Sequence, residues 1–410
     1  MTHFSARSDG NALTDEDREE ALAQPEAGNG SRTEPEPPAR KPAKFRRRRT
    51  WVSTVFALPF VAGCLGVVLL IGIFRWPRAN VPVFYVTVRP AWMWFAGLLP
   101  FLAIGVFGVR KRWVAAGILL WAVGLCACDD IQRTFRPFSG RAQRRFASAH
   151  MAFRSFVEQG GAPDSVPLRI VTWNVQGGRR GPDEAIEQLA TLAPDLVFFQ
   201  EYQWGGRRTI ARAIEDNPEF AEYHLDDQDR LAILSRFPVK RLPRNEMAQY
   251  RGAAWEIEPL PGRRIICINA HMPPLELRTQ IVRGISWAML EENILKAREH
   301  LERLSAAIDR YRTEAPVIIA GDLNLPSRYA DLRRATNGLK EAFASGGYGW
   351  PYTVPANHKR IPFPILRVDA IFVPEDAKVF RTRAVPTLFS DHYPMLTETR
   401  IPLGTEATDP

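Results

Sequence analysis

The chain has 410 residues, 46% of them hydrophobic and 24% charged, so it is neither wholly disordered nor collagen-like and has room for two or three domains. Four cysteines in this length exclude a disulfide scaffold. The net charge of +9 is uneven: residues 1–164 carry 22 Lys and Arg against 13 Asp and Glu, whereas residues 165–400 carry 32 against 30. The larger part of the chain is therefore nearly neutral, which disfavours nucleic acid as its partner.

A polar tail precedes a set of uncharged segments. Residues 1–50 contain few large apolar side chains, and we expect a disordered tail because they cannot bury enough surface to offset chain entropy. Residues 51–74 carry no charge and, as a helix, are long enough to span a bilayer core of about 30 Å. Two further uncharged stretches are 91–109 and 113–128. The sequence thus predicts a membrane anchor over 51–130 with three transmembrane helices.

Two other interpretations of these stretches are disfavoured. Three of them in quick succession are unusual for the buried helices of a soluble protein, and the first is too long and too far along the chain for a cleaved signal peptide. An odd number of crossings puts the tail and the C-terminal domain on opposite sides. Basic residues on the two sides nearly balance, but the run Arg46 to Arg49 beside the first stretch favours a cytoplasmic tail. We therefore expect a multi-pass protein of the cell membrane with an extracytoplasmic C-terminal domain.

Residues 131–164 are basic and contain Gly and Pro, which indicates a linker between the anchor and the C-terminal domain. Its arginines are suited to anionic lipid head groups, although a plain solvated linker has the same composition. Only Cys267 falls in the C-terminal domain, so no disulfide within that domain is expected.

Residues 165–402 alternate between short apolar runs and helical spacing. A helix is predicted over 183–192, and a second over 285–308, where apolar residues recur every three or four positions. Strands are predicted at 168–175, 195–199, 231–234, 264–269, 317–320 and 368–373. This pattern predicts an α/β or α+β domain, followed by a short tail at 403–410.

Polar side chains follow many of these strands. The strand ends contain the sequences Trp-Asn, Gln-Glu, Asn-Ala-His, Gly-Asp-Leu-Asn, Val-Asp and, near the end, Ser-Asp-His. Carboxylate and amide oxygens are ligands that Mg²⁺ favours, and imidazoles can exchange protons with a phosphoryl group or water. Each element alone is more commonly a turn residue or a solvated surface group. The ordered set is different, because α/β proteins assemble their sites at the carboxyl ends of strands.

Together these motifs resemble the endonuclease/exonuclease/phosphatase superfamily. The resemblance covers roughly residues 168–400 and no part of the predicted anchor. It implies a four-layer sandwich, in which two mostly antiparallel sheets pack face to face with helices outside. One departure is Arg230, which precedes Leu-Ala-Ile-Leu-Ser-Arg where the family usually has Gly. Another is Ala370, which follows Asp369 where an aromatic residue is common.

The resemblance also implies roles for individual residues. Asn174 and Glu201 would hold the catalytic metal, with Asp391 near a metal position. Asp322 would orient and deprotonate the attacking water. The phosphate would be contacted by His271 and Asn324, and His392 would act together with Asp369.

The implied activity is hydrolysis of a phosphate ester by a Mg²⁺-dependent enzyme, with Mn²⁺ as an alternative metal. The substrate is not fixed by the shared site. With the predicted anchor, a lipid-linked or head-group phosphate at the bilayer is favoured. A nuclease is the alternative, but it should show a basic face. A tethered binding module without catalysis is a third reading, disfavoured by the complete set of candidate groups. No protein partner is predicted.

Overall fold

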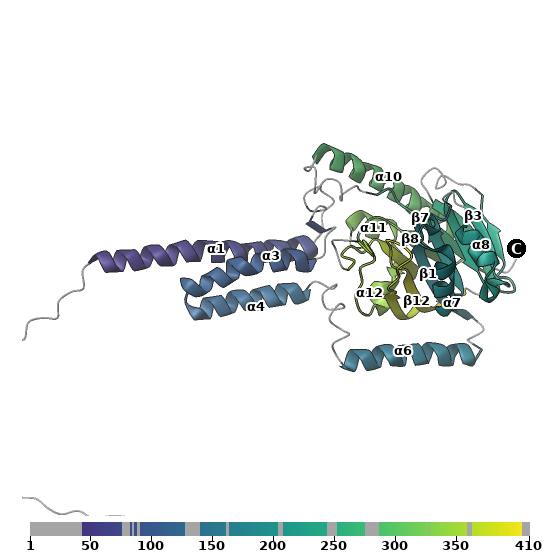
Figure 1. The fold of residues 1–410 in the computed structure, drawn as a ribbon, viewed down its shortest axis with the longest axis horizontal. Helices are drawn as coiled ribbons and strands as arrows, with labels where there is room; N and C mark the ends of the chain where they lie inside the picture. The colour runs from purple at the N-terminus through teal and green to yellow at the C-terminus, as the bar shows by residue number, and fades with distance from the viewer. Residues whose placement is uncertain are drawn as a thin grey trace, which may run out of the picture. The chain divides into compact units, whose positions relative to one another are not determined.

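The structure is a computed structural model (Figure 1). The residues that it describes are 43–75, 83, 86–87, 91–127, 140–160, 164–203, 208–243, 252–274, 287–327, 329–358 and 363–403. Most of the predicted tail, residues 1–42, lies outside these ranges, as do 128–130 of the predicted anchor, 131–139 and 161–163 of the predicted linker, and 404–410 at the C-terminus. The chain divides into two units, Met1–Arg49 and Thr50–Pro410, and the second contains nearly all of the described residues.

The apolar N-terminal stretches form helices α1 (Ala43–Arg75), α3 (Ala91–Ile104) and α4 (Lys111–Ala127). Phe60 of α1 packs against two glycines, since a β carbon at Gly105 or Gly117 would come within 3 Å of its ring. Glycines allow this close approach of helices. Outside the contacts, all three helices leave large apolar side chains exposed.

One of these helices, over Ser53–Phe74, is long and apolar enough to cross a bilayer. The prediction of three transmembrane helices is therefore supported for the first stretch only. The second stretch leaves the α-helix at Ile104 and continues as a short 3-10 turn over Gly105–Phe107. The third helix begins with Lys111 and Arg112, which leaves a shorter apolar length. Their apolar character was predicted correctly. The helix α3 ends before the second uncharged run does, whereas α4 covers nearly all of the third.

The described residues of the C-terminal part form two six-stranded sheets. Sheet A has the order β11-β12-β1-β2-β4-β3, with strands β1 (Ser165–Asn174), β2 (Leu196–Gln200), β3 (His224–Gln228), β4 (Leu231–Ser235), β11 (Lys378–Ala384) and β12 (Met395–Pro402). Sheet B has the order β5-β6-β7-β8-β10-β9, with strands β5 (Val239–Arg241), β6 (Gly252–Leu260), β7 (Arg263–His271), β8 (Val317–Asp322), β9 (Leu339–Glu341) and β10 (Asp369–Pro374).

Each sheet is mixed, with one parallel pair among antiparallel neighbours. The parallel pairs are β1 with β2 in sheet A and β7 with β8 in sheet B. The sheets pack face to face through one apolar core that combines Ile170 and Phe198 of sheet A with Trp255, Ile318 and Ile371 of sheet B. The β2 sequence Leu-Val-Phe-Phe is continuously apolar because both faces of this strand are buried.

Helices cover the outer faces of the two sheets. Sheet B is covered by α10 (Trp287–Tyr311) and α11 (Ala330–Ala335), and sheet A by α7 (Pro182–Thr191) and α8 (Ile210–Glu215). The remaining short elements are α12 (Ala342–Gly346) and the 3-10 turns Gln176–Gly178 and Pro218–Phe220. The result is two mixed sheets flanked by helices, which agrees with the predicted sandwich.

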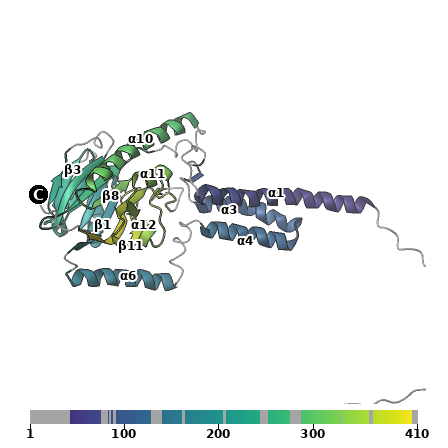
Figure 2. The same ribbon diagram turned by 180° about the vertical axis from the view of Figure 1, so that it is seen from behind.

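A further helix, α6 (Gly140–Glu158), lies within the segment predicted as a linker. Figure 2 shows it alongside the sandwich, and it contacts β11, β12 and β1. Phe146 stacks on Tyr348 with ring centroids 4.1 Å apart, and Phe153 meets Phe380 edge-on at 5.5 Å. It therefore belongs to the helical layer outside sheet A.

Candidate active site

Three of the predicted site residues stand in one row across sheet B. His271 ends β7, Asp322 ends the parallel strand β8, and Asp369 begins the antiparallel strand β10. Asp322 is the register partner of both His271 and Asp369, and all three are buried. Register partners on neighbouring strands lie about 5 Å apart, so this row brings an imidazole and two carboxylates together. The Nε2 atom of His271 lies 3.6 Å from Oδ2 of Asp322.

Sheet A contributes Asn174 and Glu201 to the same edge. Asn174 ends β1, and Glu201 directly follows the neighbouring strand β2. The Nδ2 atom of Asn174 donates to Oε1 of Glu201 at 3.2 Å and to Oδ2 of Asp322 at 3.1 Å. Asn174 thus joins the two sheets. Glu201 has a backbone φ of 50°, an uncommon conformation for Glu that is often found at functional sites, and its side chain is 25% exposed.

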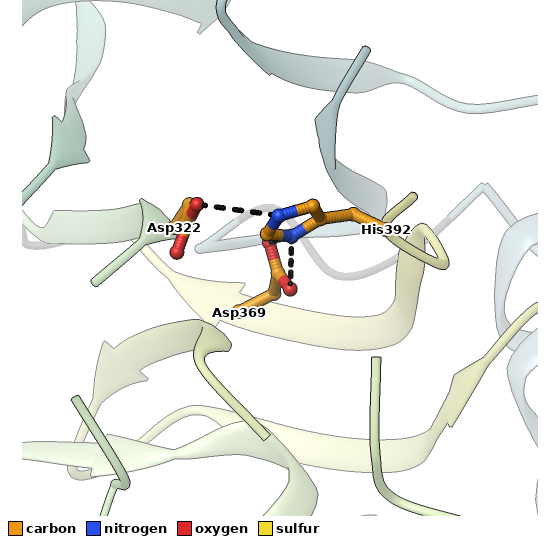
Figure 3. A group of neighbouring side chains, drawn as sticks. All are labelled: Asp322, Asp369 and His392. Carbon is orange, nitrogen blue, oxygen red and sulfur yellow. Dashed lines mark hydrogen bonds and ion pairs between the residues drawn. The ribbon is translucent and has the colours of Figure 1, made fainter. Parts of the chain in front are cut away.

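His392 and Asp369 form a buried pair beside Asp322 (Figure 3). The Nδ1 atom of His392 lies 3.0 Å from Oδ2 of Asp369, and its Nε2 lies 3.7 Å from Oδ2 of Asp322. Thr353 donates its hydroxyl to the same oxygen of Asp369. The pairing at Nδ1 orients the ring and leaves Nε2 directed toward Asp322.

Electrostatics favour a charged His392. Burial alone would oppose the charge, but the carboxylates of Asp369, Asp322 and Asp391 outweigh it and raise the pKa of His392 to about 10. Burial, assisted by the neighbouring Asp322 carboxylate, raises the pKa of Asp369, although His392 opposes this shift. An imidazolium at neutral pH is a hydrogen-bond donor, and it can stabilise negative charge on a phosphoryl oxygen.

The last two predicted residues, Asp391 and Asn324, lie at the border of this constellation. Gln176 connects Asp391 to Asn174: its backbone N–H donates to Oδ1 of Asn174 and its Nε2 donates to Oδ2 of Asp391, both at 3.1 Å. Asn324 donates its backbone N–H to Oδ1 of Asp322 at 3.0 Å, and its Nδ2 donates to the Met272 carbonyl at 2.8 Å. All eight predicted site residues are therefore brought to one edge of the sandwich.

The carboxylates near Glu201 suit a divalent cation. Glu201 contacts the Asn174 side chain, and Gln176 connects the Asn174 oxygen to the Asp391 carboxylate, so oxygen atoms of three side chains gather at this edge. Such an oxygen-rich set matches the preference of Mg²⁺. Ligand-type atoms of Asp322, Asp369 and His392 also lie within 4.8 Å of one another. Asp369 and His392 are already paired with each other, which fits the holding of a proton better than the holding of a metal.

Other buried polar residues support the site and were not among the predicted ones. Gln200 donates to Oδ1 of Asn269 at 2.8 Å, and Asn269 donates to the carbonyls of Phe199 and Ala232. These two amides bridge sheets A and B one residue before Glu201 and two before His271. Their positions within the Gln-Glu and Asn-Ala-His motifs are the signal that could have identified them. Thr353 had no such signal, because it lies far from Asp369 in sequence.

The profile of the Endonuclease/Exonuclease/phosphatase family matches residues 171–392, more than half of the chain. No curated protein sequence matches this chain. Similar solved structures include a humanized D. rerio TDP2 carrying 14 mutations (18% identity, TM-score 0.43) and a beta toxin from Staphylococcus aureus (16%, 0.42). A third is the 3′ phosphatase NExo from Neisseria bound to a product DNA hairpin (19%, 0.40). The alignments cover 56–57% of this chain and 98–99% of those chains.

Proposed function

Because the chain belongs to the endonuclease/exonuclease/phosphatase family, whose members hydrolyse phosphate esters, we propose that it is a membrane-anchored, divalent-metal-dependent phosphoesterase. The observation that carries this proposal is the position of Asp322. Its Oδ2 atom lies 3.1–3.7 Å from nitrogen atoms of Asn174, His271 and His392. A carboxylate held among these groups can accept a proton from water while its neighbours hold the phosphate.

In the proposed reaction, Asp322 orients the attacking water and takes its proton. As the new P–O bond forms and the ester P–O bond breaks, His271 and Asn324 contact phosphoryl oxygens, and the leaving oxygen takes a proton from solvent water to depart as the alcohol. His392, charged and oriented by Asp369, stabilises the growing negative charge. A Mg²⁺ or Mn²⁺ ion held by Asn174 and Glu201, with Asp391 nearby, would supply neutralisation of the phosphate charge.

We place the membrane anchor at α1, the helix that is long and apolar enough to span. The apolar side chains that α3 and α4 leave exposed suit a hairpin packed on α1 within the bilayer. Such a hairpin adds either two crossings or none, so the total remains odd in both cases. The catalytic domain then lies opposite the N-terminal tail, and the basic run before α1 favours an extracytoplasmic domain.

The favoured substrate is a lipid-linked or head-group phosphate. An anchor holds the site close to the bilayer, where such substrates are concentrated, and the nearly neutral residues 165–400 do not require a polyanionic partner. Nucleic acid is the alternative substrate.

The full-length protein in detergent should be assayed with Mg²⁺ against a polyprenyl pyrophosphate, phospholipids, sphingomyelin and supercoiled DNA. The His392→Ala variant and a chelator provide the negative controls, and His224→Ala, at an exposed histidine that begins β3, provides a matched histidine control. We expect lipid turnover that both negative controls abolish and His224→Ala retains. DNA nicking without lipid turnover would show that the substrate is a nucleic acid and not a lipid. The absence of turnover on every substrate would contradict the proposed phosphoesterase activity.

A further inference from the structure

One face of helix α6 packs against the sandwich. Besides the aromatic contacts of Phe146 and Phe153, its His150 Nδ1 lies 3.1 Å from the buried Glu398 carboxylate of β12. Glu398 also pairs with Arg381 of β11 and with Arg169 of β1. These contacts come from three neighbouring strands of sheet A. They hold α6 in one orientation, so its opposite face is presented outward in a defined way.

Three exposed arginines stand near the beginning of α6. Arg141, Arg144 and Arg145 are exposed, and together with Lys378 of β11 they line a cavity of about 830 Å³. The other lining residues are small or apolar: Ser148, Ala149, Ala152, Val379 and Phe380. None of the lining residues is acidic, and among the described residues no ion pair engages any of the three arginines. Four cationic side chains thus surround a cavity whose base is apolar. Such a cavity suits a ligand that has an anionic group attached to an apolar part.

Further along the same helix, the large apolar side chain of Met151 is 61% exposed. Val157, in contrast, lines a cavity toward the sandwich together with Phe153 and Val166. A helix that presents basic residues and an exposed apolar side chain is typical of one that lies at a membrane surface. The long apolar stems of the arginines can also extend along such an interface while their charged ends contact head groups.

Chain connectivity keeps α6 near the proposed anchor. Helix α4 ends at Ala127 and α6 begins at Gly140. Thirteen residue steps of fully extended chain reach at most about 45 Å. The outward arginines therefore remain within reach of a bilayer that contains the apolar helices.

Building on the proposed membrane anchoring, but not on the catalytic activity, we propose that α6 and Lys378 form a binding surface for anionic phospholipid head groups. The phosphate of the lipid is held by Arg141, Arg144, Arg145 and Lys378, and its glycerol and upper acyl carbons lie over the apolar floor of the cavity. This contact fixes sheet A against the bilayer and gives the tethered catalytic domain one orientation. Nucleic acid fits less well, because the three arginines are confined to about one turn of helix rather than arranged along a phosphate backbone.

Arginine footprinting on the full-length protein tests this surface. The protein is placed in nanodiscs of phosphatidylcholine, with or without phosphatidylglycerol, and the rate of phenylglyoxal modification at each arginine is measured by mass spectrometry. Arg154 on the same helix and outside the cavity lining serves as the internal reference. We expect the anionic lipid to slow modification of the three cavity arginines at least about fivefold relative to Arg154 and high salt to reverse the effect.

Variants separate the surface from a general charge effect. Lys378→Gln should weaken the protection about fivefold, the contribution of one cation near an anionic membrane. Lys240→Gln, at an exposed lysine of β5 outside the cavity, should leave it unchanged. Thermal unfolding checks that both variants remain folded. Equal modification rates in the two lipid mixtures would overturn the proposal. Protection by inorganic phosphate or by duplex DNA in phosphatidylcholine nanodiscs would overturn it in favour of a small-anion site or a nucleic-acid site. Failure of the protein to incorporate into nanodiscs would instead contradict the anchoring.

Discussion

Gly321 and Ala270 lie so close together on the parallel strands β8 and β7 that a β carbon at Gly321 would stand 1.8 Å from the Ala270 carbonyl oxygen. The two residues directly precede Asp322 and His271, so this close approach determines how near the carboxylate and the imidazole can lie. The Gly at this position of the Gly-Asp-Leu-Asn motif is therefore a steric requirement.

Gly321→Ala should force β7 and β8 apart. We expect a loss of about 3 kcal/mol in the free energy of unfolding, the upper end of the usual cost of overpacking, together with loss of activity. Thermal unfolding and a hydrolysis assay measure the two effects. Gly97→Ala is the matched control, because a β carbon there meets no atom within 4 Å. A fully active and stable Gly321→Ala protein would show that the strands adjust without displacing the site.

Removal of the Glu201 carboxylate should weaken the proposed metal site. Glu201→Gln retains the size of the side chain and its capacity to accept from Asn174 but removes the negative charge. We expect Mg²⁺ affinity to fall at least about 100-fold, because changes even to groups that only support metal ligands cost 10–100-fold. Calorimetric titration of Mg²⁺ into the full-length protein measures this directly. Glu187→Gln, on the exposed face of α7, should bind Mg²⁺ like the wild type; equal binding by both variants would remove Glu201 from the metal site.

The sequence predicted the buried framework of the domain well. The strands that correspond to β1, β2, β4, β7, β8 and β10 and the helices that correspond to α7 and α10 all lie close to the expected ranges. Their signal is strong because each strand is an apolar run buried on both faces. The candidate site residues Asn174, Glu201, His271 and Asp322 were predicted for the same reason, since each ends or directly follows such a run. Asp369 instead begins β10, and Asp391 and His392 precede β12.

Strands β11 and β12 were missed because their outer face is charged. Arg381 and Glu398 are register partners there, and α6 covers them. A sequence with charges on alternate residues looks like a solvated segment. Only the packing of α6 shows that these charges form a buried network of ion pairs. The helix itself was hidden by its arginines, which gave it the composition of a linker.

The structure also explains how the chain accommodates Arg230 at the position where the family usually has Gly. Asp229 and Arg230 are the two turn residues between β3 and β4, with φ values of 52° and 76°. These left-handed conformations are the ones that glycine adopts without strain, which explains the glycine expected there. The Arg230 carbonyl accepts from the backbone N–H of Tyr202, next to Glu201. The turn is therefore retained with Arg in place of Gly.

The hydroxyl of Thr353 should position Asp369 for its contact with His392. Both Thr353 and Asp369 are fully buried, and the hydroxyl donates to the oxygen that lies nearest to Nδ1 of His392. Thr353→Val removes this donor at nearly constant shape. We expect kcat to fall about tenfold with little change in KM, which corresponds to the loss of one hydrogen bond to a charged group.

Thr353→Ser provides the discriminating control, because it keeps the hydroxyl and removes only a methyl group. Steady-state kinetics should show that kcat is largely restored in Thr353→Ser. Equal losses in both variants would indicate that Thr353 contributes through packing rather than through its hydrogen bond to Asp369.

Two adjacent carboxylates on β3 should respond to acid in opposite directions. Burial works against the charge of Asp226, but hydrogen bonds from Arg241 and Trp255 outweigh it and lower its pKa. The pKa of Asp227 is raised, chiefly by burial and further by the Asp226 charge. Asp226 therefore contributes stability above its unfolded pKa of about 3.9, and this contribution is lost as the pH falls through the lower folded value. Asp227 contributes stability at low pH that is lost as the pH rises through its raised folded value.

Urea unfolding of the full-length protein across the acid range, from about pH 3 to pH 6, measures both contributions. Asp226→Asn should flatten the rise in unfolding free energy with increasing pH, because the variant lacks the group whose proton affinity is lower in the folded state. Asp227→Asn should steepen the same rise, because it removes a group that binds its proton more tightly in the folded state. Each variant is the control for the other, because both remove one charge from β3. If the unfolding free energies of the two variants changed with pH in parallel, the opposite environments assigned to these carboxylates would be contradicted.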